Sequence, residues 1–145
     1  MATDRRADVI WKGSLMEGAG TITKTTSGAI GEQPVSWAAR SEDASAGKTS
    51  PEELIAAAHA SCFSMALSHA LSEAGKPPDR LRVKATSTFV PGTGITTMRL
   101  EVRGRVEGMS EEEFERAAEQ AKETCPVSRA LNGNVDIQLD AALDN

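Results

Sequence analysis

The sequence of 145 residues contains two cysteines, Cys62 and Cys125, and these are the side chains best suited to do chemistry. A cysteine can be inert packing, a metal ligand, half of a disulfide or a reactive centre. Cys62 lies within the small apolar run PEELIAAAHASCFSMALSHAL, residues 51–71, where burial favours the protonated thiol. Taken alone, Cys62 is therefore best interpreted as a structural core thiol, and a reactive role requires a cation from elsewhere in the chain.

Cys125 occurs at a junction in ETCPVSRAL, where a charged helix ends and Pro126 can begin another turn. If Cys125 caps that new turn, free N–H groups face its thiol and partly activate it. If it only ends the preceding helix, the carbonyl groups there work against a thiolate. The sequence does not choose between these possibilities, and an ordinary junction residue is the third.

Arg40, at the end of VSWAAR, is the candidate cation, because its planar guanidinium can lie against a thiolate and be held by a carboxylate. His59 precedes Cys62 by three residues on the same side of a helix, which permits a Cys–His dyad, but such a histidine is more often a packing residue. His69 is a similarly weak candidate. The sequence has no CxxC, no HxxxH and no cluster of ligands at metal-binding spacing, so we expect no metal site.

Composition excludes several classes of protein. A net charge of −5, with 16 Lys and Arg against 21 Asp and Glu, argues against binding to nucleic acid. No apolar run approaches the roughly 18 to 20 residues of a membrane span, and the N-terminus lacks a signal-peptide segment, so we expect no membrane association and a cytoplasmic location. In that reducing compartment, a bridge between the cysteines would be transient and catalytic.

The length predicts one domain over residues 1–145. Short β-type runs within residues 8–40, the last being PVSWAAR, predict an antiparallel meander, and the polar stretch 41–50 predicts a loop. A helix is then predicted from Pro51, with Ser50 as its cap and Glu53 completing a capping box. This helix is apolar nearly all round as far as Leu71, so we expect it to be central, and Gly75 with Pro77 and Pro78 supplies its stop signal.

Two alternating runs, within residues 80–92 and 95–108, predict a hairpin whose turn lies near Gly92 to Gly94. A charged helix follows, with Ser110 as cap and Glu113 completing a capping box, and a last strand is expected over residues 135–143. The order strands, helix, strands, helix, strand indicates an α+β fold.

Three segments together resemble the OsmC/Ohr family of thiol-dependent peroxidases: TSPEELIAAAHASCFSMAL, the downstream CPVSRAL and the earlier PVSWAAR. The segment WKGSLMEGAGTI is similar to the opening strands of that family, so the resemblance covers nearly the whole chain. The OsmC branch is the better match, because Ohr-type proteins carry their arginine on an earlier glycine-rich segment. Ser50 stands where asparagine is frequent, and the two residues are equivalent as helix caps.

The resemblance implies a site and an assembly. It implies that Cys62 is the peroxidatic cysteine, which becomes a sulfenic acid, and that Cys125 is the resolving cysteine, which forms a disulfide with it. Arg40 matches the arginine that polarises the thiolate, and Glu52 matches the carboxylate that orients this arginine. The resemblance further implies no cofactor, and an intertwined homodimer with antiparallel sheets wrapped around two central helices.

Helix geometry adds a constraint on that site. Glu52 and Cys62 are ten residues apart, which is about 15 Å along a straight helix, so both cannot touch a single Arg40. No proline or glycine lies between them to break the helix. We therefore predict a site at a dimer interface, built from both subunits, and the sequence does not fix which subunit supplies Arg40.

The apolar helical neighbours of Cys62 suit organic hydroperoxides better than hydrogen peroxide; they are Ile55, Phe63, Met65 and Ala66. The resemblance implies the same substrates, with dihydrolipoyl groups or small dithiols as reductants. Two alternatives from other classes stay open. One is a redox sensor or binding protein that uses the same disulfide without significant turnover, and the other is a structural domain with two unrelated cysteines.

Overall fold

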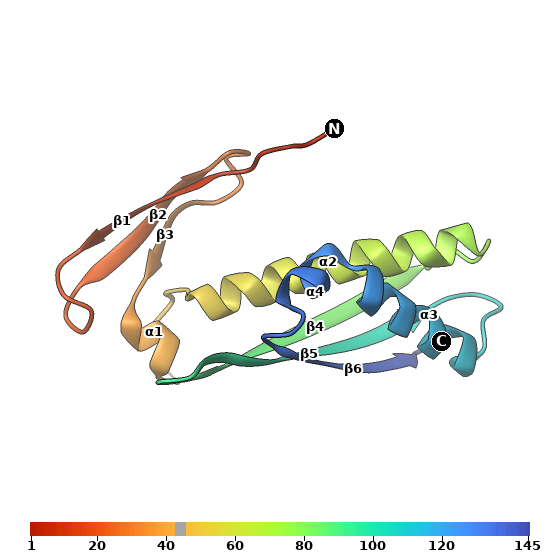
Figure 1. Cartoon of the computed structure of the whole chain (residues 1–145). Helices are drawn as coiled ribbons and strands as arrows, with labels where there is room; N and C mark the ends of the chain where they lie inside the picture. Colours follow the sequence, from red (N-terminus) through yellow and green to blue (C-terminus); the bar gives the residue numbers. More distant parts are fainter. Residues whose placement is uncertain (43–45) are drawn as a thin grey trace. The chain divides into compact units, whose positions relative to one another are not determined.

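A computed structural model describes residues 1–42 and 46–145, which form two compact units, residues 1–54 and 55–145. Residues 43–45 of the loop predicted over residues 41–50 lie outside the described residues. In chain order the elements are β1 Ala7–Lys12, β2 Ala19–Thr25, β3 Gly31–Val35, α1 Trp37–Ser41, α2 Pro51–Glu73, β4 Arg80–Val90, β5 Gly94–Arg105, α3 Glu111–Thr124, α4 Pro126–Leu131 and β6 Asp136–Leu143 (Figure 1). This order confirms the α+β class.

The first unit contains a sheet of β1, β2 and β3 in sequence order, with antiparallel pairing throughout (Figure 1). The predicted meander is therefore confirmed for these strands. A close approach within it requires glycine: a Cβ on Gly20 would lie 2.6 Å from the ring of Trp11 on the neighbouring strand. The bare backbone of Gly20 thus lets the indole lie flat against β2.

The prediction that PVSWAAR is a strand is wrong beyond Val35, because residues Trp37–Ser41 form the short helix α1. Ser36 starts this helix, since its hydroxyl accepts a hydrogen bond from the backbone N–H of Ala39 at 3.1 Å. A serine cap followed by two alanines overrides the β-type reading of the segment. Arg40 consequently lies on a helix and not at the end of a strand.

The ends of α2 confirm the predicted start and stop signals. Ser50 caps the helix by accepting from the N–H of Glu53 at 3.2 Å, but the Glu53 carboxylate accepts from the Thr49 hydroxyl at 3.0 Å instead of closing the predicted capping box. At the other end Gly75 has a φ of +75°, and the N–H of Lys76 returns to the carbonyl of Leu71 at 2.9 Å. This left-handed turn ends the helix where the glycine predicts it.

The expectation that no run is long and apolar enough for a membrane span needs correction. Helix α2 has 23 residues, and an 18-residue window of it has a mean hydropathy of 1.4, which suffices by length and composition. A core helix of a soluble protein passes the same test, and α2 has a fully buried face made of Phe63, Leu67 and Leu71. Only 22% of that window is buried, so packing within the described residues accounts for one face of α2.

The second unit contains the sheet β4-β5-β6. The hairpin β4–β5 is antiparallel and turns at residues 91–93, and β4 alternates between exposed and half-buried residues, as predicted. β6, however, runs parallel to β5, so the expectation of purely antiparallel sheets is wrong here. The reason is the connection through α3 and α4, which carries the chain back along the sheet before β6 begins.

The core of the second unit lies between α2, α3 and one face of the sheet (Figure 1). Helix α3 has the full predicted capping box: Ser110 accepts from the N–H of Glu113 at 3.2 Å, and the Glu113 carboxylate accepts from the N–H of Ser110 at 2.8 Å. Phe114 then packs so closely on β5 that a Cβ on Gly104 would lie 2.5 Å from its ring. Helix α3, anchored by Phe114, continues to the junction that holds Cys125.

Candidate functional site

The structure brings the two cysteines together although 63 residues of sequence separate them. Cys62 lies half-buried on α2, Cys125 is fully buried between α3 and α4, and both are free thiols. The two thiols are near enough for Cys125 to shift the pKa of Cys62, and the backbone N–H of Val127 acts on the Cys62 thiol as well. This proximity argues against two unrelated structural cysteines.

The surroundings of Cys62 in the second unit favour its neutral form. Burial is the largest influence and raises the pKa of Cys62, and the neighbouring Cys125 raises it further. The N–H of Val127 acts in the opposite direction and lowers that pKa. The net pKa lies above the ordinary thiol value, so the need for a cation that the sequence predicts is still unmet within this unit.

Cys125 occupies both of the capping positions that the sequence left open. Its N–H donates to the carbonyl of Ala121 at 2.8 Å and ends α3, while its own carbonyl accepts from the N–H of Arg129 at 3.0 Å and starts α4. Its side chain makes no capping hydrogen bond to α4. The thiol is therefore left to interact with Cys62.

A second pair of side chains joins α2 to α4 beside the thiols. His59 Nε2 lies 2.7 Å from the hydroxyl of Ser128, and both side chains are buried. Burial lowers the pKa of His59, so the ring is neutral at neutral pH, and its Nδ1 atom has no hydrogen-bond partner. The hydrogen bond of His59 thus goes to Ser128, and the Cys–His dyad that the spacing permits is not what the structure shows.

Sequence reasoning missed Ser128, although a signal was present. His59 precedes Cys62 by three residues and Ser128 follows Cys125 by three, so two segments that meet at their cysteines also meet one turn away. The other histidine, His69, lies exposed on α2. Among the residues that the structure describes, no group of three or more His, Cys, Asp or Glu could hold a metal ion.

Arg40 and Glu52 form an ion pair in the first unit. Arg40 Nε donates to Glu52 Oε1 at 2.8 Å, and the Glu52 side chain is only 8% exposed against 31% for Arg40. Glu52 lies in the first turn of α2, where the helix dipole favours a carboxylate. A buried carboxylate that accepts a hydrogen bond from Nε restrains the guanidinium, which is compatible with the orienting role that the resemblance implies for Glu52.

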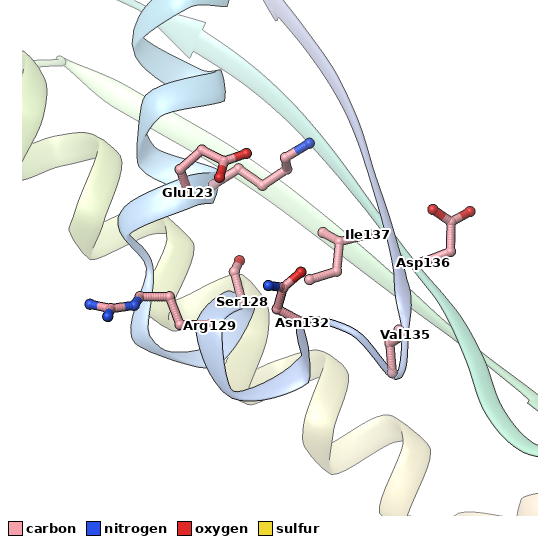
Figure 2. A pocket seen from close by; sticks show the side chains of 8 residues that line it. Glu123, Ser128, Arg129, Asn132, Val135, Asp136 and Ile137 are labelled. Atoms are coloured by element: carbon pink, nitrogen blue, oxygen red, sulfur yellow. The ribbon is translucent and has the colours of Figure 1, made fainter.

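A cavity of about 520 Å³ adjoins Ser128 and is lined by the end of α3, by α4 and by the start of β6 (Figure 2). Its walls are mainly polar, and Lys122, Glu123, Arg129, Asn132 and Asp136 contribute to them. Neither cysteine lines this cavity. It therefore borders the His59–Ser128 pair and not the thiols.

Fold and site together define an α+β protein in which a thiol on a long apolar helix meets a second thiol at a helix junction. Residues 43–140 match the family model described as OsmC-like protein. The chain belongs to the OsmC family. This confirms the family that the sequence motifs indicate.

Individual relatives agree with this assignment. The chain is 37% identical over 144 residues to Peroxiredoxin OsmC of Escherichia coli, covering 96% of this chain and 99% of the relative. It is 33% identical over 101 residues to the organic hydroperoxide resistance protein OhrA of Bacillus subtilis, covering 65% and 67%. The crystal structure of OhrB from Bacillus subtilis superposes with a TM-score of 0.65 at 26% identity, covering 94% and 97%. The family thus contains peroxiredoxins and hydroperoxide resistance proteins.

Proposed function

We propose that this protein reduces organic hydroperoxides to alcohols with its two cysteines. The contact between the Cys62 and Cys125 thiols is the observation that carries the proposal. Cys62, as a thiolate, attacks the terminal peroxide oxygen; the O–O bond breaks, the alcohol leaves with a proton, and Cys62 becomes a sulfenic acid. The Cys125 sulfur then bonds to Cys62, water departs, and an external dithiol reduces the disulfide to two thiols.

Cys62 is assigned the attacking role because it is the less buried of the two thiols. Cys125, fully buried and in contact with Cys62, suits resolution, which needs no access to the peroxide. The apolar neighbours of Cys62 favour a substrate with an apolar tail, and dihydrolipoyl groups or small dithiols are the proposed reductants. The relatives' names, which include organic hydroperoxide resistance, support this substrate class.

Activation of Cys62 is assigned to Arg40, held by Glu52. The raised pKa of Cys62 within its own unit requires a cation, and Arg40 is oriented by a buried carboxylate at 2.8 Å. Helix α2 is unbroken over Pro51–Glu73, so the ten residues from Glu52 to Cys62 correspond to about 15 Å along it. We therefore assign Arg40 and Glu52 of one subunit to Cys62 of the other in an intertwined homodimer.

Both units are assigned to a single OsmC-like domain, residues 1–145, that works without a cofactor in the cytoplasm. Support for the single domain comes from Peroxiredoxin OsmC of Escherichia coli, whose match covers 96% of this chain and 99% of the relative.

The shared site can be tested by mixing subunits. As homodimers, chains that carry Cys62→Ser are expected to be inactive, and chains that carry Arg40→Lys are expected to keep only roughly a tenth to a hundredth of the parent rate. A mixed dimer contains one site with an intact Cys62 and an intact Arg40 only if the two come from different chains, so mixing should restore activity. A mixture as inactive as its parents, or a fully active monomer, would overturn the shared site.

A redox sensor that uses the same disulfide without significant turnover is the second candidate, because the proximity of the two thiols favours the disulfide in either case. To separate the two, reduced protein is mixed with cumene hydroperoxide or with hydrogen peroxide, free thiols are followed over time, and a dithiol is then supplied in excess. Sustained turnover, faster with the organic substrate, supports the enzyme. A single oxidation that the dithiol does not turn into a cycle supports the sensor, and thiols that persist exclude both.

A further inference from the structure

The hydrogen bond between His59 and Ser128 lies one helical turn from the pair of thiols. His59 and Cys62 are spaced by three residues on α2, and Cys125 and Ser128 are spaced by three at the start of α4. Three residues rise about 4.5 Å along a helix and return to nearly the same face. Two side-chain contacts therefore join the same two segments side by side, one between thiols and one between an imidazole and a hydroxyl.

Of these two contacts, the one between His59 and Ser128 is the stronger. It joins Nε2 to a hydroxyl at 2.7 Å with His59 fully buried and Ser128 only 4% exposed, whereas a thiol is a weak donor and a weak acceptor. Breaking it would leave two buried polar groups without partners. Helix α4 has only six residues, too few to hold its place by its own helical hydrogen bonds, so contacts with its neighbours must orient it.

Two groups at the start of α4 lie near enough to Cys62 to influence its thiol: the thiol of Cys125 and the N–H of Val127. Ser128 is the next residue along, and its side chain bonds to α2. A rotation of α4 about its axis would move all three groups together. The hydrogen bond between Ser128 and His59 is therefore in a position to control how closely the Cys125 thiol lies to Cys62.

We propose that His59 and Ser128 are positioning residues, whose buried hydrogen bond orients α4 so that the Cys125 thiol lies against Cys62 and the disulfide closes rapidly. In turnover, which rests on the proposed function, the pair speeds resolution and not the attack on peroxide. Losing it prolongs the life of the sulfenic acid and so increases overoxidation of Cys62 to the sulfinic acid.

The positioning can be measured without peroxide, in glutathione redox buffers. Oxidised glutathione converts the two thiols to a disulfide and yields two molecules of reduced glutathione, so the equilibrium reports the effective concentration of one thiol at the other. Ser128→Ala should lower this effective concentration about fivefold. Ser128→Thr keeps the hydroxyl and His59→Gln keeps a polar nitrogen near the place of Nε2, so both should stay close to the parent.

The cavity beside Ser128 makes the threonine variant practicable, because it offers room for the added methyl group (Figure 2). Ser64→Ala is the matched control: it removes a hydroxyl from α2 that bonds only to the carbonyl of Ala60, at 2.7 Å. This control should keep the parent effective concentration. Thermal unfolding of each variant separates a general loss of stability from a loss of positioning.

Two results would overturn the inference. One is an unchanged or higher effective concentration in Ser128→Ala, and the other is an equal loss in Ser128→Thr, which would show that the hydrogen bond is not the cause. Failure of the proposed function has a different signature: the parent would form the disulfide in glutathione buffers but not with a hydroperoxide.

Discussion

The two pairs of side chains assigned to catalysis are built in opposite ways. The thiols of Cys62 and Cys125 lie near each other in the second unit and come from segments far apart in the sequence. Arg40 and Glu52 are charged, are twelve residues apart, and lie in the first unit on two neighbouring helices. The reacting atoms are thus positioned by a hydrophobic core, while the activating charge is positioned by local capping and an ion pair.

This difference indicates that neither pair of side chains is sufficient for the proposed reaction by itself. The thiols have the proximity that a disulfide needs, but burial raises the pKa of Cys62. The ion pair has an oriented charge but no nucleophile. Experiments that damage one pair while sparing the other should therefore affect different steps.

The largest expected effect concerns the thiols. Cys62→Ser should abolish peroxide reduction, because no other group takes the oxygen atom. Cys125→Ser should allow one attack per molecule and then stall at the sulfenic acid or proceed to overoxidation, which intact mass would show as one or two added oxygen atoms. Equal residual turnover in both variants would contradict this division of roles.

A substitution in the Arg40–Glu52 pair should have a smaller effect on peroxide reduction than the loss of Cys62. Arg40→Lys keeps the charge but loses the planar fork held by Glu52, so the rate of attack should fall roughly tenfold to a hundredfold at unchanged stability. Stopped-flow mixing with an organic hydroperoxide measures that rate. Arg5→Lys, a change at an exposed arginine, is the control; an unaltered rate in Arg40→Lys would remove Arg40 from the site.

Two strand glycines, one from each unit, should also differ in their tolerance of a methyl group. A Cβ on Gly104 would lie 2.5 Å from the Phe114 ring, so Gly104→Ala should reduce the free energy of unfolding by about 1–3 kcal/mol. A Cβ on Gly31 in β3 would have its nearest neighbour at 3.8 Å, so Gly31→Ala should change it by less than about 0.5 kcal/mol. Urea unfolding measures the stability of both variants. Similar losses of stability in Gly104→Ala and Gly31→Ala would argue against tight packing of α3 on β5.

The smallest effect concerns pH. Burial lowers the pKa of His59, so as the pH falls this side chain takes up a proton in the unfolded chain before it does so in the folded chain. Stability from this group is therefore present above about pH 6.5 and is lost as the pH falls below that value. Urea midpoints at pH 7.5 and 5.5 should show a smaller loss in His59→Gln than in the parent. An identical loss would assign the pH dependence to other groups.

Local signals predicted much of the fold. Ser50, Ser110 and Gly75 mark helix ends through hydrogen bonds within a few residues, and the alternation of β4 reflects one buried face. The helix at Arg40 was missed because Trp37 and the residues before it suit a strand, and the Ser36 cap outweighs that preference. The direction of β6 depends on how far α3 and α4 carry the chain, which no local pattern encodes.

The candidate site, like the fold, has one part that local sequence patterns predict and one part that they do not. Cys62, Cys125, Arg40 and Glu52 could be named from motifs, and the contact of the thiols and that of Arg40 with Glu52 are present in the structure. Ser128 was missed, because its spacing of three residues from Cys125 becomes informative only when tertiary packing brings it to His59. Polar groups buried by packing are thus the part of the site that local patterns fail to reveal.

Cys125 ends one helix and begins the next with its backbone alone, since its N–H and carbonyl make both capping bonds. Its sulfur packs into the core but makes no capping hydrogen bond to α4. Replacing the thiol with another small side chain therefore leaves both capping bonds in place, and a single nucleotide change can convert such a protein between one reactive thiol and two. In evolutionary terms, the second cysteine is a feature that descendants of this fold can gain or discard without having to refold around the change.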